Sequence, residues 1–258
     1  MQRPPHRTPP ILLTRPTYEW ISRVNQKHKQ LEDLGLSAEQ KNQLDRWLET
    51  EFVYSTLKLE GSSVTRDQVS RLVSSSRIPN ALDESDPASA ALLASLRKIT
   101  SLARAKGKAA AVTVDLLLDI HNVPGAAQGF RTSAGDTTQL AKPVSPESLP
   151  AVIETACQWY SADSFAELHP IEQASLVFLR LIEIQPFEQS NERSALMAAS
   201  LFTLRSGLPP IVIKPDMQSA YRNALDEGTR MNTKPMVEFV AELIDRSLTE
   251  MIEEVENR

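Results

Sequence analysis

Apolar residues recur every three to four positions along most of this chain, which is the spacing that gathers them on one face of an α-helix. Runs in which apolar and polar residues alternate, as they do in a half-buried strand, are scarce. The spacing predicts helices over residues 16–34, 38–59, 65–73, 87–105, 113–121, 148–161, 165–184, 191–205, 216–231 and 235–255. We therefore expect a mainly α-helical protein.

Glycines and short polar residues mark several of the expected helix ends. Gly35 suits the end of the first helix, because glycine adopts the left-handed conformation that often follows a last turn. Ser37 is a good N-cap for the second helix, which Glu60 and Gly61 close. Between Pro124 and Pro146 the helical spacing stops, and glycines, prolines and hydroxyl residues predict a loop or a small hairpin.

The composition agrees with helices and narrows the class of partner. The chain has 258 residues, of which 5% are aromatic and 8 are glycine, a poor match to a turn-rich all-β protein. A net charge of −5 lacks the basic surface that binds nucleic acid, and no apolar run reaches the roughly 18 residues that span a bilayer. The basic, proline-rich residues 3–10 predict an extended arm, and the single cysteine fits a reducing compartment. We expect a cytoplasmic protein with no nucleic acid or membrane partner.

Residues 169–197 contain the most informative pattern. An apolar helix breaks at Pro186, a short polar loop follows, and a second helix begins near Asn191. The first N–H groups of a helix lack partners within it, and together with the helix dipole they suit an anion such as phosphate. This layout predicts an anion site at the start of the second helix.

The loop reads Gln185-Pro-Phe-Glu-Gln-Ser-Asn-Glu-Arg193 and resembles the Fic motif, which runs His-Pro-Phe, any residue, Asp or Glu, Gly-Asn-Gly-Arg. The chain keeps Pro186, Phe187, Asn191 and Arg193 of that motif. Further segments are similar to family signatures in the same order: Thr56–Gly61 to the inhibitory helix, Gly129–Thr132 to the strand that leads into the flap, Leu168–Pro170 to a helix start, and Tyr221–Leu225 to a later helix.

The resemblance implies the mainly α-helical Fic (Fido) fold with a small β-hairpin flap, here over Arg131–Leu140. It implies a Fic-like core over residues 81–258, preceded over residues 1–80 by an arm and a helical extension that carries the inhibitory-like residues Thr56, Glu60 and Gly61. Members of the family transfer AMP from ATP, with magnesium, to a hydroxyl of a target protein, and their flap aligns that target. Arg131 and Thr132 would belong to the flap.

The motif departs from the family at the positions that perform chemistry. Gln185 stands at the position of the catalytic His, and a carboxamide cannot remove a proton near neutral pH. Gln189 stands at the acidic position that holds magnesium, although the neighbouring Glu188 could supply the missing charge. Ser190 and Glu192 replace two glycines that let phosphate approach the backbone, and we expect the Glu192 carboxylate to occupy part of that site.

Asn191 and Arg193 remain as nucleotide-binding residues, with Ser190 and Glu192 beside them. Arg193 suits phosphate oxygens, but pairing with Glu192, Glu188 or Glu60 is the favoured interpretation. The family often has a second Arg three residues later, where this chain has Leu196. Glu60 is therefore expected to lack the partner that the inhibitory Glu usually has.

Three hypotheses follow from this pattern. The first is a catalytically inactive Fic-fold protein that binds a target or partner protein through the flap edge or a helical face and needs no cofactor. The second is a divergent adenylyltransferase that uses ATP and magnesium with a base from elsewhere, and the third is a nucleotide sensor without turnover. His121 is expected to cap a helix C-terminus or lie at the surface, His169 to begin a helix, and Cys157 to be a packed thiol. The oligomeric state stays open.

Overall fold

The computed structural model describes residues 18–75, 86–121, 124–125, 129–135 and 144–256. Within these ranges the chain forms eleven α-helices and contains no strand. The helices are α1 (Tyr18–Asp33), α2 (Ala38–Leu59), α3 (Arg66–Ser74), α4 (Pro87–Lys106), α5 (Val114–Ile120), α6 (Leu149–Tyr160), α7 (Asp163–Ala166), α8 (Pro170–Ile184), α9 (Asn191–Leu204), α10 (Gln218–Thr229) and α11 (Lys234–Glu256). The predicted mainly α-helical class is confirmed.

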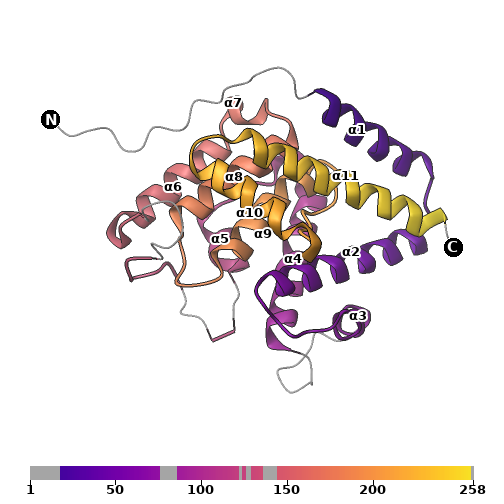
Figure 1. Ribbon diagram of the computed structural model, residues 1–258, viewed down its shortest axis with the longest axis horizontal. Helices are drawn as coiled ribbons and strands as arrows, with labels where there is room; N and C mark the ends of the chain where they lie inside the picture. The colour runs from indigo at the N-terminus through magenta and orange to yellow at the C-terminus, as the bar shows by residue number, and fades with distance from the viewer. Residues whose placement is uncertain (1–17, 76–85, 122–123, 126–128, 136–143, 257–258) are drawn as a thin grey trace.

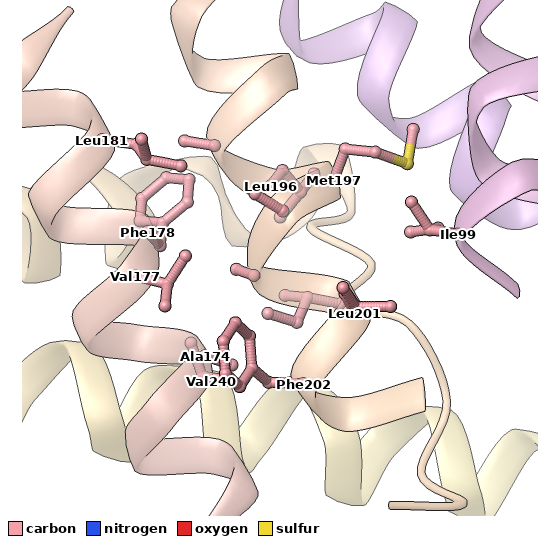
Figure 2. Close-up of a cluster of buried hydrophobic side chains, with 14 of the residues drawn as sticks. Ile99, Ala174, Val177, Phe178, Leu181, Leu196, Met197, Leu201, Phe202 and Val240 are labelled. Atoms are coloured by element: carbon pink, nitrogen blue, oxygen red, sulfur yellow. The ribbon is translucent and has the colours of Figure 1, made fainter. Parts of the chain in front are cut away.

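Helices α8 and α9 form the centre of the molecule and are joined by the loop that carries the motif. Helices α10 and α11 pack against α8, and helices α4 and α5 pack against α9. Every residue of α9 from Arg193 to Thr203 is buried, which explains why this helix has no clear polar face. Figure 2 shows Phe178 and Leu181 of α8 facing Leu196 of α9 in this core.

The N-terminal helices share the same core. Trp20 of α1 and Phe52 of α2 are buried in one apolar cluster with Phe178 and Phe202. Helix α1 lies along α11, and α2 packs on α3, α4 and α11 (Figure 1). The expected boundary near residue 80 lies outside the described residues, so the division into an extension and a core stays a prediction.

The ends of α2 and α3 follow the sequence. The Ser37 hydroxyl accepts the Gln40 N–H at 3.2 Å, while the Gln40 side chain accepts the Ser37 N–H at 3.0 Å. Thr65 begins α3 with the same reciprocal arrangement. Gly35 and Gly61 follow α1 and α2 with φ of +59° and +81°, a conformation that glycine adopts without strain.

The prediction of a single helix over residues 165–184 is wrong. The structure divides it into α7 and α8, with residues 167–169 between them. Pro170 is the reason, because it has no N–H to donate and its ring crowds the preceding turn, so it fits only the first turn of a helix. His169 is the N-cap, as expected, and its Nδ1 accepts the Ile171 N–H at 3.3 Å.

The predicted hairpin over Arg131–Leu140 is only partly within the described residues. Residues 129–135, which we call the pre-flap segment, form bends and contain no strand. Residues 136–140 lie outside the described ranges, so the hairpin stays a prediction. None of the described helices combines the length and the apolar character needed to cross a bilayer.

An ion-pair network fixes the position of α2. Lys214 donates to both carboxylate oxygens of Glu250 on α11 at 2.7 Å, and it lies 3.5 Å from Glu51 of α2. Because Glu51 is buried, its charge needs such a partner. The network holds the C-terminal half of α2, and with it Glu60, against the core.

Candidate functional site

The motif loop connects α8 to α9 through two residues in the left-handed conformation. Gln185 ends α8 with φ 48° and ψ 66°, and Ser190 precedes α9 with φ 55° and ψ 33°. Neither residue is a glycine, so each conformation costs energy and persists only where surrounding contacts fix it. At position 192, by contrast, the backbone is already helical, so a glycine there would provide space rather than conformational freedom.

Asn191 supplies the main fixing contact. Its Oδ1 accepts the Phe187 N–H at 2.9 Å, and its Nδ2 donates to the Phe187 carbonyl at 2.8 Å. The Ser194 hydroxyl also donates to the Ser190 carbonyl at 3.1 Å. Asn191 is predicted to bind nucleotide. In this structure its polar atoms instead hold the loop in its shape.

A buried histidine supports the loop from inside. His121 is the C-cap of α5, as expected, but it is 8% exposed and does not lie at the surface. Its ring stacks on Phe187 with centroids 3.6 Å apart and planes 1° from parallel, and its Nδ1 lies 2.9 Å from the Ser194 Oγ. Burial, with a smaller effect of Arg193, lowers the pKa of His121 to about 4, so the ring is neutral at physiological pH.

This contact between His121 and the motif was missed in the sequence. His121 and Phe187 are far apart along the chain, and a histidine at a helix end has many structural uses. The apolar helix that precedes His121 was the sole local signal, and it indicates a cap rather than a stacking partner.

Arg131 joins the pre-flap segment to the end of α8. It is 2% exposed, its N–H donates to the Pro186 carbonyl at 2.9 Å, and its Nε donates to the Gln185 carbonyl at 2.6 Å. Its Nη1 donates to the Ser133 carbonyl at 2.6 Å. A cation at the C-terminus of a helix is favoured by the helix dipole, so Arg131 stabilises this end of α8. Gln185 itself, at the expected catalytic position, is 3% exposed.

Glu188 binds the pre-flap segment from the other side. Its Oε1 accepts the N–H groups of Thr132 at 2.8 Å and Ser133 at 3.1 Å, and its Oε2 accepts the Ser133 hydroxyl at 2.5 Å. The Ser133 hydroxyl bond, followed by the two amide bonds, lowers the pKa of Glu188 to about 2. The carboxylate that could have replaced the missing magnesium ligand is thus committed to Thr132 and Ser133.

Arg193 is bound by Glu60, one of the three acidic partners that the sequence allowed. Its Nε donates to Glu60 Oε1 at 2.9 Å and its Nη2 donates to Oε2, so the pair is bidentate. The side chains of Arg193 and Glu60 are 7% and 28% exposed. Glu60 therefore has a partner even though Leu196 replaces the second arginine of the family.

Beside this pair lies a cavity of about 20 Å³, lined by Thr56, Glu60, Glu192, Arg193 and Tyr221 among others. Among the described residues, Arg193 Nη1 is buried without a hydrogen-bond partner at this cavity. A volume of about 10–15 Å³ holds one water molecule, so this space is far too small for a nucleotide. The Glu192 carboxylate lies 3.4 Å from Arg222 Nη1 of α10. Whether Glu192 fills a phosphate position stays a prediction.

The residues at this loop do not fit magnesium and ATP in the arrangement described. Gln189 is exposed and presents a neutral amide, which is a weak substitute for a carboxylate ligand. Asn191, Glu188 and Arg193 already have the partners given above. No group of three metal-ligating side chains occurs among the described residues.

Comparison with known proteins finds one family whose model matches part of the chain. Residues 111–203, which include the pre-flap segment, α8, the motif loop and most of α9, match the model of the Fic/DOC family. Over these residues the chain is similar to the Fic/DOC family. The Fic signatures in the sequence indicated the same family.

The relatives differ in how much of each chain they match. The protein adenylyltransferase fic-1 of Caenorhabditis elegans is 26% identical over 207 residues, which cover 78% of this chain and 41% of fic-1. A Fic domain containing signaling protein from Bacteroides thetaiotaomicron has the same fold, with a TM-score of 0.78, 23% identity, and coverage of 93% of this chain and 98% of that one. This chain thus spans about two fifths of fic-1.

A more distant structure, a variant of IbpAFic2 in complex with adenylylated Cdc42, has a TM-score of 0.52 and 14% identity, and it covers 90% of this chain and 71% of that one. At this identity the similarity concerns the fold alone. The predicted Fic fold is confirmed over the described helices, whereas the flap and the chemistry of this chain are separate questions.

Proposed function

We propose that this Fic-domain protein has lost nucleotide transfer and acts by binding another protein. The observation that carries the proposal is the bidentate pair between Glu60 and Arg193, combined with Gln185 at the position of the base. The resemblance assigns both Arg193 and residue 185 to the reaction. Arg193 is held by the Glu60 carboxylate, and Gln185 has no proton that it can exchange.

No described residue of the site takes over the role of the missing catalytic general base. General base catalysis contributes about 10² to 10⁴-fold, and Gln185 cannot provide it. His121 contacts the motif, but its ring stacks on Phe187 and its pKa is lowered to about 4. It is placed to support the loop and not to take a proton from a target hydroxyl.

Phosphate binding would require the chain to give up an internal contact. Breaking a fully buried ion pair costs about 3–5 kcal/mol when one partner is left without a counter-charge, and breaking this pair, in which Glu60 is 28% exposed, should cost somewhat less. A phosphate that replaced Glu60 would recover part of this cost, but it would then approach the carboxylates of Glu60 and Glu192. The inhibitory-like residues Thr56, Glu60 and Gly61 thus support closure of the site, with Glu60 competing directly for Arg193.

The partner of this chain would be a protein that docks at the flap or on a helical face. The structure of the IbpAFic2 variant contains a bound protein, Cdc42, which supports the idea that a Fic fold can present a surface to another protein. An edge strand in the predicted hairpin would suit β-strand addition. The identity of the partner, and the absence of nucleic acid and membrane partners, stay part of the proposal.

The alternative is a divergent adenylyltransferase. Its support is the buried Arg193 Nη1 beside the small cavity, together with the curated relative, which is a protein adenylyltransferase. A nucleotide sensor would need the same opening of the site without the reaction. Both alternatives require ATP and magnesium to displace Glu60 from Arg193.

One assay separates these functions. The purified protein is incubated with a cell lysate, magnesium and ATP labelled at the α-phosphate, and protein-bound label is measured after electrophoresis. We expect no label with the natural sequence. The combined variant Gln185→His, Gln189→Asp, Ser190→Gly and Glu192→Gly is the matched control, and label on a protein with that variant alone would show that the fold still supports transfer. Label with the natural sequence would refute the proposal.

A further inference from the structure

The contacts of Glu188 define a binding site on the pre-flap segment. We infer that Thr132 and Ser133 form an oxyanion site, that Glu188 occupies it as a built-in ligand, and that a carboxylate or phosphoryl group of a partner protein binds there when it displaces Glu188. The partner class rests on the proposed protein-binding function. The oxyanion site itself does not depend on that function.

The donor set is that of an anion site. Two consecutive N–H groups converge on one carboxylate oxygen, at 2.8 and 3.1 Å, and the hydroxyls of Thr132 and Ser133 add donors at 3.3 and 2.5 Å. Consecutive backbone N–H groups that point to one spot form a concave anion-binding nest. All four contacts are made by donors, so the arrangement favours a negatively charged oxygen over a neutral or cationic group.

The buried positive charge of Arg131 beside the site also favours a negatively charged ligand. Arg131 precedes the two donor residues directly and is almost fully buried, and its guanidinium donates to main-chain carbonyls. Its positive charge and the Glu188 carboxylate attract one another, which counteracts the effect of burial on the pKa of Arg131. An oxyanion that replaces Glu188 would receive the same attraction.

The site is accessible from outside. Thr132, Ser133 and Glu188 are all exposed, so an external group can reach the donors if Glu188 moves aside. Glu188 lies between Phe187 and Gln189 in the motif loop, and its release would leave the hydrogen bonds of Arg131 to join the pre-flap segment to that loop. A partner that presents an acidic or phosphorylated residue would therefore bind to the pre-flap segment and weaken its contact with the motif loop.

The test uses the full chain labelled with ¹⁵N, with the amide signals of Thr132 and Ser133 as the readout. Inorganic phosphate and acetate are titrated separately, at constant ionic strength, into the natural protein and into Glu188→Ala. A tethered carboxylate has an effective concentration of about millimolar or more, so we expect the variant to bind phosphate at least about tenfold more tightly than the natural protein does. Comparison of phosphate with acetate shows whether a phosphoryl or a carboxylate group fits better.

Glu154→Ala is the matched control, because Glu154 is an exposed glutamate on α6 away from the loop. It should behave like the natural protein.

A second test variant is Glu188→Gln, which keeps the size of the side chain and loses its charge. It should bind the anions more tightly than the natural protein does, and it decides the question if Glu188→Ala does not fold. Absence of saturable shifts at Thr132 and Ser133 in the folded Glu188 variants would overturn the site. If Thr132 and Ser133 show saturable shifts but binding assays find no protein partner, the proposed function is refuted and the oxyanion site is not.

Discussion

At the scale of single residues, polar side chains of the motif loop bind other groups of the same chain. Asn191 binds the backbone of Phe187, Glu188 binds Thr132 and Ser133, and Arg193 binds Glu60. Each of these side chains has a charge or an amide that could serve a nucleotide or a metal ion. In this protein the partners of all three side chains are protein groups.

His121 gives a testable pH dependence. Its pKa is about 4 in the folded protein and near 6.5 when exposed, so the unfolded state takes up a proton first as the pH falls. Its contribution to stability is therefore complete above about pH 6.5 and is lost as the pH falls from there toward 4, up to about 3 kcal/mol. His169, whose pKa is also lowered to about 4 by burial, acts in the same direction.

Urea unfolding between pH 4 and pH 8 measures this loss. His121→Gln should be less stable at neutral pH, because it loses the stack on Phe187, but its stability should vary less with pH than that of the natural protein. An unchanged pH dependence in this variant would show that His121 titrates normally in the folded state.

The sequence could predict the order of the site residues but not all of their partners. Gln185 to Arg193 are contiguous, so a resemblance over nine positions placed them correctly. Arg193 and Glu60 are 133 positions apart, and three carboxylates were open to Arg193 until the helices were placed. The stack of His121 on Phe187 could not be predicted at all, because it depends on how α5 packs against α9.

At the scale of secondary structure elements, helix ends bring the site together. The C-terminus of α2 supplies Glu60, the N-terminus of α9 supplies Arg193, and the loop after α5 leads to the pre-flap segment. Apolar spacing and the Ser37 cap predicted these helices to within a few residues. The break at residues 167–169 was missed because apolar residues continue through it, although Pro170 marks the start of α8.

The pair between Glu60 and Arg193 is expected to join α2 to α9. Glu60→Ala leaves the buried Arg193 without a counter-charge and should lower the free energy of unfolding by about 2–4 kcal/mol. The double variant Glu60→Leu with Arg193→Leu should recover much of this loss, because no buried charge remains. Chemical unfolding of the single and double variants measures the difference.

A matched control for this prediction is Glu238→Ala. Glu238 pairs with Lys234 at 3.6 Å on the surface of α11, where both side chains are about half exposed. An exposed pair contributes at most about 1 kcal/mol, so this variant should change stability little. If Glu60→Ala were as mild as the control, Glu60 would not be the residue that holds Arg193.

At the scale of the whole molecule, one apolar core supports both the helices that match the Fic/DOC model and the helices that precede them. Trp20 and Phe52 share that core with α8, so α1 and α2 are built into the body of the protein. Helix α2 can therefore hold Glu60 at the motif loop as a fixed part of the fold. Under the proposed function, the fold is retained while Glu60 occupies the arginine that would otherwise bind nucleotide.

Calorimetric titration of ATP with magnesium into the natural protein tests this closure most directly. Our account predicts no saturable heat at millimolar nucleotide, because Glu60 holds Arg193 and the adjoining cavity of about 20 Å³ has room for about one water molecule. Saturable binding of one nucleotide per chain, lost on Arg193→Ala and retained by Glu238→Ala, would contradict it.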